Sequence, residues 1–471
     1  MRRIVLKGGN VVTMDRQVPD MPRGDVLIED DRIAALAVDL PAPDGAEVID
    51  AVDMIVLPGL INAHVHTWQS ALRGVAADWT VAQYMQAMHR GLATHFGPDD
   101  IYIANLMGAL NQINCGSTTL VDWCHNNPTP AHTDAAIEGL QDAGIRAVFL
   151  HGSPKPDPKP GQRHFSEIPM PRAEVERLRK GRFATDTGLV TFGLAILGPY
   201  YSTYEVTRQD VTLAREFGLI ASMHVGGGTS LTARGFERLA EEGLVGDKLH
   251  IVHGNDVAPE TVRLITQRGG RFTVTAEIEL QMGYGDPLTG VLHGLGSPVT
   301  IGSDVEPAAR GDMFTAMRVT LQHERNRTII ETLGATGSRP ETMPLTCRDA
   351  LEWTTVNGAS LIGLSDRVGS LTPGKQADVI LLRAGDLNMF PVRDSVGSIV
   401  MQGGVANVDT VLIAGRVVKR NGALLFADIA ARKAALARSG DRILRDFGTL
   451  PQQAAESPNR RNPPIPQTLA T

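Results

Sequence analysis

Short apolar segments bounded by Gly, Asp and Asn occupy both ends of the chain. Near the start, "RIVLKGGNVVT" has the pattern of a strand, and "DVLIEDDRIAALA" alternates and turns at an acidic pair, as a hairpin does. The same pattern returns late in the chain, in "GKQADVILLRA" and "VDTVLIAGRVVKRNG". We therefore expect residues 1–55 and 366–425 to build one small composite β-sandwich.

Residues 56–365 alternate in another way, because each apolar run is followed by a segment with helical spacing that ends in Gly, such as "TDAAIEGLQDAG". Eight strand–helix units in about 300 residues predict an α/β fold, a (β/α)8 barrel. A doubly wound open sheet is the alternative; no G-x-G-x-x-G follows the first strand, which weakens a dinucleotide-binding interpretation. The predicted strands are "VLPGLIN", "GSTTLVD", "IRAVFLH", "VTFGLAIL", "LIASMHV", "LHIVHG", "RFTVTAE" and "PVTIGSD".

Two segments fall outside these patterns. Residues 426–471 predict a helix around "KAALARSGDRILRDFG", followed by a tail rich in Pro, Gln and Asn. Such a tail has little to bury, so we expect it to be extended or disordered, or to lie on a neighbouring subunit. The Pro-rich insertion 153–171 follows the third strand, where it is either a lid over a barrel site or a surface loop.

Composition narrows the class of protein. The 471 residues are 42% apolar and 21% charged, which is ordinary for a globular enzyme. The net charge of -7 does not indicate a basic surface that would bind nucleic acid. Three cysteines without C-x-x-C spacing predict free thiols and a reducing cytoplasm. The apolar runs are too short to cross a bilayer, so we expect neither a nucleic acid nor a membrane as a partner.

Histidine and aspartate side chains lie at the ends of several predicted barrel strands. His64 and His66 are one residue apart, so on a strand both imidazoles face the same side. Strands five, six and eight end at His224, His253 and Asp304. Lone histidines would be loop or packing residues, but the C-terminal ends of barrel strands converge on one face. This clustering predicts a metal site with imidazole and carboxylate ligands.

The segments "PGLINAHVH", the strand-six "HG", the strand-eight "SD" and the closing "GSLTPGKQADVILL" resemble the amidohydrolase superfamily, in the branch of cytosine and guanine deaminases and triazine hydrolases. The resemblance implies one divalent metal held by His64, His66, His224 and Asp304. Zinc is the first expectation, with Fe, Co or Mn as alternatives. Relatives with two metals bridge them through a lysine at the end of strand four, and "FGLAILGPYYST" contains none.

The same resemblance assigns two catalytic residues. Asp304 would take a proton from a metal-activated water and pass it to the leaving nitrogen, and His253 would polarise the carbonyl or stabilise the oxyanion. We expect a small-molecule substrate and a homo-oligomer, either a dimer or a tetramer.

One departure from the family pattern bears on the reaction. Deaminases of this branch carry an acid in an H-x-x-E pattern after the strand-five histidine, whereas this chain has "HVGGG", with Gly227 at the acid's position. Glu277 or Glu279, after strand seven, could serve as a substitute acid or substrate clamp. Further candidates for the substrate pocket are Trp68, Gln69, Trp123, His125, His151, Tyr200 and Tyr201. No role is assigned to His89, His95, His132 or His323.

The missing acid favours hydrolysis of an amide, urea or carbamate-like C–N bond. The alternative is an aminohydrolase of a purine, pyrimidine or triazine in which one of the glutamates replaces the acid. A third possibility, from another class, is a metal-binding scaffold without catalysis.

Overall fold

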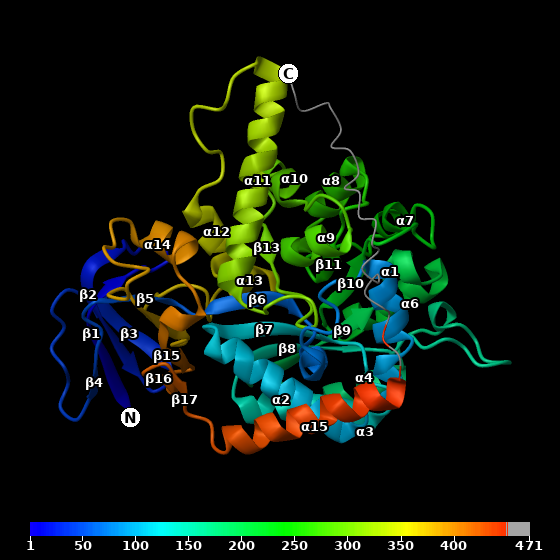
Figure 1. The fold of residues 1–471 in the computed structure, drawn as a ribbon, viewed down its shortest axis with the longest axis horizontal. Helices are drawn as coiled ribbons and strands as arrows, with labels where there is room; N and C mark the ends of the chain where they lie inside the picture. Colours follow the sequence, from blue (N-terminus) through cyan, green and yellow to red (C-terminus); the bar gives the residue numbers. More distant parts are fainter. Residues whose placement is uncertain (449, 451–471) are drawn as a thin grey trace, which may run out of the picture.

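Eight parallel strands in sequential order form the centre of the computed structural model, which describes residues 1–448 and 450 (Figure 1). A parallel bridge between Val65 and Asp304 joins the first strand to the segment after the last, so the sheet closes into a barrel. The predicted (β/α)8 fold is confirmed. The barrel strands are β6 (Leu60–Val65), β7 (Ser117–Cys124), β8 (Arg146–Gly152), β9 (Val190–Ile196), β10 (Ala221–Val225), β11 (Leu249–His253), β12 (Arg271–Val274) and β13 (Thr300–Ile301).

Every residue of β7 and β8 is buried, as expected for parallel strands covered on both faces. The covering helices begin and end at ordinary signals: Pro98 opens α2, and Gly144, with a φ of +72°, ends α3 in the left-handed region. The helices that follow the strands are α2 (Pro98–Asn114), α3 (Pro130–Ala143), α4 (Arg172–Lys180), α6 (Tyr204–Glu216), α7 (Gly235–Glu241), α8 (Pro259–Gln267), α9 (Ala276–Met282), α10 (Thr289–Gly294) and α11 (Met313–Thr336).

A second sheet of nine strands lies beside the barrel and combines both chain ends, as predicted (Figure 1). Its core includes Ile4, Val26 and Ile33 from the N-terminal strands and Val379 and Leu412 from the C-terminal ones. Its strands are β1 (Arg3–Val11), β2 (Met21–Glu29), β3 (Arg32–Ala37), β4 (Glu47–Asp50), β5 (Met54–Pro58), β14 (Val379–Arg383), β15 (Val408–Ile413), β16 (Arg416–Arg420) and β17 (Ala423–Leu424).

The predicted first barrel strand is divided between the two sheets. Its first part belongs to β5, which pairs with β1 and β14, and the chain enters the barrel as β6 after the single residue Gly59. A Cβ at Gly59 would lie 2.1 Å from the hydroxyl oxygen of Thr118, so only glycine fits this junction. The strand that carries His64 and leads into His66 is therefore fixed in position by both sheets.

The second sheet and the barrel also meet through a buried ion pair. Arg146, at the start of β8, donates two hydrogen bonds of 2.9 and 3.0 Å to the carboxylate of Asp378, and both side chains are almost fully buried. The C-terminal helix α15 (Ile429–Phe447) runs along α2 on the outside of the barrel (Figure 1). The predicted extended tail lies outside the described residues.

Shorter elements complete the fold. No helix within residues 1–448 and 450 is long and apolar enough to cross a membrane. The remaining helices and turns are η1 (Thr67–Leu72), α1 (Val81–Tyr84), η2 (Met85–His89, a π turn), η3 (Leu92–His95), η4 (Phe165–Glu167), α5 (Gly198–Tyr201), α12 (Cys347–Trp353), α13 (Val356–Leu361), α14 (Ser395–Met401) and η5 (Val405–Asn407).

Candidate active site

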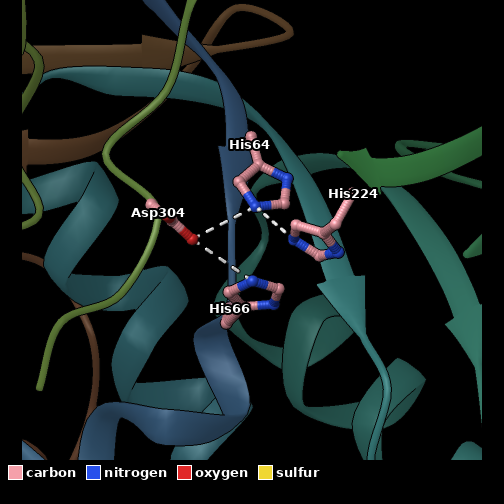
Figure 2. Close-up of side chains that lie close together, drawn as sticks. All are labelled: His64, His66, His224 and Asp304. Atoms are coloured by element: carbon pink, nitrogen blue, oxygen red, sulfur yellow. Dashed lines mark hydrogen bonds and ion pairs between the residues drawn. The ribbon is translucent and has the colours of Figure 1, made fainter. Parts of the chain in front are cut away.

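Four side chains converge at the C-terminal end of the barrel (Figure 2). The Nε2 atoms of His64 and His66 lie 3.2 and 3.3 Å from Oδ1 of Asp304. The Nε2 atom of His224 lies 3.2 Å from that of His64. One potential ligand atom from each of the four residues lies within 4.8 Å of the other three. Spacing of this kind suits a single small cation.

The protonation of the histidines agrees with such a role. The Nδ1 atom of His66 must donate to the carbonyl oxygen of Trp123, 2.6 Å away, because a carbonyl can only accept. Its Nε2 therefore presents a lone pair to the cluster. Burial lowers the pKa of His64 to about 4 and that of His224 well below its usual value. The facing Nε2 atoms of His64 and His224 either share one proton in a hydrogen bond or present two lone pairs, and in the second case a cation between them removes their repulsion.

The carboxylate of Asp304 is held ionised. Burial would raise its pKa, but the neighbouring imidazoles of His64 and His66 outweigh burial and keep the pKa well below the usual range. Its second oxygen, Oδ2, points the other way, 3.4 Å from the Thr275 hydroxyl and 3.8 Å from Nε2 of His253. Oδ2 is thus the oxygen that remains for proton transfer.

His253 is held beside the cluster by a glutamate. Its Nδ1 lies 3.2 Å from Oε1 of Glu279 and 3.0 Å from the Thr275 hydroxyl. Both His253 and Asp304 have a positive φ, +66° and +60°, which is strained for residues other than glycine. Strain of this kind concentrates at functional sites, and here it affects the two predicted catalytic residues.

A small pocket opens beside these groups, and its walls include three tyrosines. Its lining residues are His66, Tyr84, Met85, His89, His125, Tyr201, His224, His253, Ile278, Met282, Tyr284, Asp304 and Val305. Of the predicted substrate contacts, His125 and Tyr201 are among them. Three lining residues, Tyr84, His89 and Tyr284, come from short or irregular segments that the strand and helix pattern did not single out.

The other predicted substrate contacts lie around the pocket or away from it. Trp68 and Gln69 are buried behind the pocket wall. There the Trp68 side chain donates a hydrogen bond to His125, and the Gln69 side chain donates one to Tyr84. The Trp123 ring packs on His224, with ring centroids 4.2 Å apart. On α5 the pocket is lined by Tyr201, the residue after Tyr200.

Neither predicted glutamate lines the pocket. Glu279 is fully buried, and besides His253 it accepts from the backbone N–H of Thr275 and from the Asn255 amide. Glu277 is also outside the lining set, and burial raises its pKa. In this structure Glu279 orients His253 instead of facing a substrate.

The glycine triplet leaves room for a tyrosine. A Cβ at Gly226 would lie 3.0 Å from the Tyr284 ring. At Gly227 it would lie 3.2 Å from Val81 and 3.7 Å from Tyr284. The Tyr201 hydroxyl donates to the carbonyl oxygen of Gly226, 2.7 Å away. Val81 and Tyr284 thus border the position at which the family pattern places the acid.

The Pro-rich insertion contributes one buried cation. Lys155 is 4% exposed, and its Nζ lies 5.6 Å from the centroid of the Trp123 ring and 4.9 Å from that of Tyr201. Burial lowers its pKa to about 8. Much of the surrounding segment is exposed, but this side chain reaches the back of the pocket wall.

Comparisons with known proteins agree with this architecture. A sequence profile of the amidohydrolase family matches residues 55–418. A 5-methylthioadenosine/S-adenosylhomocysteine deaminase from Symbiobacterium thermophilum is 25% identical over 89% of this chain and 94% of its own length. A 5'-deoxyadenosine deaminase from Methanothermobacter thermautotrophicus is 25% identical, covering 85% of this chain and 90% of its own length.

Two solved structures have the same fold. An adenosine deaminase from Xanthomonas campestris with bound zinc superposes with a TM-score of 0.79 at 21% identity, covering 93% of this chain and 98% of its own. A triazine hydrolase from Arthrobacter aurescens gives a TM-score of 0.81 at 23% identity, covering 93% of this chain and 100% of its own.

Proposed function

Because the chain belongs to the amidohydrolase family, we propose that it is a metal-dependent hydrolase of a non-peptide C–N bond in a small molecule. The observation that carries the proposal is the convergence of His64, His66, His224 and Asp304 beside His253. A divalent ion held by these four side chains would polarise the scissile group and lower the pKa of a bound water to about 7. Zinc fits the nitrogen-rich set best, and Fe, Co or Mn are the alternatives.

The chain's own residues provide the proton transfer. Asp304 Oδ2 lies away from the histidine pair and takes the proton that the attacking water loses, then returns it to the leaving nitrogen. His253, oriented by Glu279, lies on the side where a carbonyl oxygen gains negative charge, and its Nε2 stabilises that charge. An amide, urea or carbamate nitrogen needs no other acid, so this substrate class fits the pocket best.

A second candidate, deamination of an aminated heterocycle, is favoured by the relatives named above. It needs a group that protonates the ring nitrogen, and a side chain at Gly227 would be crowded by Val81 and would lie against Tyr284. Glu277→Gln is expected to change turnover little, because Glu277 does not line the pocket. Glu279→Gln is expected to lower kcat by about a hundredfold through the loss of a fixed His253, for either substrate class.

The test is to measure metal content in protein purified without added metal, and then to screen zinc-loaded protein for ammonia or amine release. The panel contains simple amides, ureas and carbamates beside 5'-deoxyadenosine and 5-methylthioadenosine. We expect about one ion per chain. His66→Ala and Asp304→Asn should lose the metal or the turnover, whereas His293→Ala, at an exposed site, should keep both.

Two outcomes would contradict the proposal. Two tightly bound ions per chain would refute a mononuclear site. Stoichiometric metal with no turnover across the whole panel would favour the scaffold interpretation. Efficient release of ammonia only from the nucleosides would decide for the second candidate.

A further inference from the structure

Three buried side chains form a hydrogen-bonded chain that ends at the pocket. The indole Nε1 of Trp68 lies 3.1 Å from Nδ1 of His125, and Nε2 of His125 lies 3.1 Å from Nε2 of His89. Both histidines line the pocket, and the His125 ring lies against His66, with ring centroids 4.5 Å apart.

The indole decides the direction of every hydrogen bond in this chain. Trp68 Nε1–H can only donate, so Nδ1 of His125 must accept and carries no proton. The single proton of a neutral His125 is then on Nε2, which donates to His89. His89 Nε2 must accept, and its own proton is therefore on Nδ1. Each step follows from the one before, because a neutral imidazole has one donor and one acceptor nitrogen.

The last nitrogen of the chain is the one left for a ligand. Within the described residues of the protein, the Nδ1 of His89 makes no hydrogen bond, and it is not among the fully buried unpartnered atoms. His89 closes the π turn η2, whose first residue, Met85, also lines the pocket. Single π turns occur often at functional sites, because the extra residue redirects a side chain.

Resting on the hydrolase function proposed above, we propose that Trp68 and His125 fix His89 as a neutral Nδ1–H donor that bonds to the substrate. The substrate therefore presents a lone-pair acceptor to this wall of the pocket: the carbonyl oxygen of an amide, urea or carbamate, or an unprotonated ring nitrogen. An amino group at the same place would meet a donor and be rejected, since an unpaired buried polar group costs affinity.

The surroundings of His89 and His125 keep both imidazole rings neutral. Both rings are buried, and burial together with the Lys155 ammonium lowers the pKa of His89 well below the usual value, although Asp304 acts in the opposite direction. A second proton on either ring would also break one of the two hydrogen bonds. The donor on His89 is therefore present across the neutral pH range.

The test reads the tautomers directly. Zinc-loaded protein labelled with 15N-histidine is examined by NMR at pH 7.5, with signals assigned by their loss in His89→Asn and His125→Asn. We expect His89 as the Nδ1–H tautomer and His125 as the Nε2–H tautomer. A His89 protonated on Nε2, or on both nitrogens, would overturn the proposal.

Trp68→Phe tests the role of the indole and keeps the aromatic ring. Without the N–H donor, His125 is free to place its proton on Nδ1, so the Nδ1–H form of His89 should fall. Unchanged tautomers in Trp68→Phe would show that the indole does not set the direction. The wild-type spectrum decides the proposal even if this variant does not fold, and it needs no substrate, so failure of the proposed reaction is distinguished from failure of the tautomer argument.

A pair of His89 variants then tests contact with substrate, using the panel compound of highest turnover. His89→Asn keeps an N–H near the Nδ1 position, whereas His89→Leu removes it. We expect His89→Leu to lower kcat/KM by about 10- to 100-fold, the scale of one lost hydrogen bond, and His89→Asn to recover most of that loss. Equal values for the two variants, both measured with full metal content, would refute donation to the substrate.

Discussion

Restoring the missing acid at Gly227 is expected to damage the protein without creating a ring deaminase. Gly227 has a φ of +77°, and a Cβ there would lie 3.2 Å from Val81. Gly45 provides a matched control, because its φ is +75° and a Cβ would have no neighbour within 4 Å. Gly45→Ala thus measures the backbone strain alone, about 1 kcal/mol. The contact with Val81 should bring Gly227→Ala to ~2 kcal/mol.

The glutamate side chain would also extend past the Tyr284 ring, which lies 3.7 Å from that Cβ. We expect Gly227→Glu to lower the free energy of unfolding by about 2–4 kcal/mol, the sum of strain and overpacking. Adding Tyr284→Ala should recover part of this loss, because the neighbouring ring is removed. The assay is urea unfolding at equal zinc content, together with ammonia release from 5'-deoxyadenosine.

Two results would refute this reasoning. Equal stability of Gly227→Glu and Gly45→Ala would show that the space is open. A tenfold gain in ring deamination by Gly227→Glu alone would show that an acid at this position can reach a substrate past Tyr284.

Three further predictions concern residues outside the pocket. Arg146→Met or Asp378→Asn should each lower the free energy of unfolding in urea by about 3–5 kcal/mol, and the double variant should lower it by less than the sum of the two. Breaking the exposed pair of Arg172 and Glu216 should lower it by less than about 1 kcal/mol. Lys155 has a pKa of about 8, below its usual 10.5, so its charged form opposes folding; Lys155→Met should stabilise by ~2 kcal/mol at pH 7, and the gain should fade as the pH rises through 8 toward 10.5. Cys124→Ser should keep turnover and metal, because this buried thiol does not line the pocket; loss of turnover with metal retained would contradict the assignment of chemistry to the metal cluster.

The eight barrel strands could be predicted because each is a short, nearly continuous apolar run followed by a helical segment that ends in Gly. The C-terminal ends of parallel barrel strands all lie on one face of the barrel. The convergence of His64, His66, His224 and Asp304 therefore followed from the strand assignment alone. The pairing of the two chain ends followed in the same way from their shared strand pattern.

The pocket walls were harder to predict, because periodicity gives no side-chain direction outside regular elements. His89 and Tyr284 lie in a π turn and in the segment after α9, where neither the strand nor the helix period applies. Glu279 was singled out for its position after strand seven, but α9 begins there and turns its side chain back toward His253. The sequence also could not distinguish Tyr200 from Tyr201, which were both predicted to line the pocket, and only Tyr201 does.

The continuity of β5 and β6 through Gly59 has a consequence for the timing of synthesis. β5 pairs on one side with β1, which is made first, and on the other side with β14, which begins more than 300 residues after β5 ends. At 5–20 residues per second, the ribosome needs roughly 15 s to 1 min to make that stretch. During this interval the strand leading into His64 and His66 has one unpaired edge. The metal cluster therefore gains its final support only near the end of translation, and a nascent chain stalled before Val379 should bind metal more weakly than the released protein.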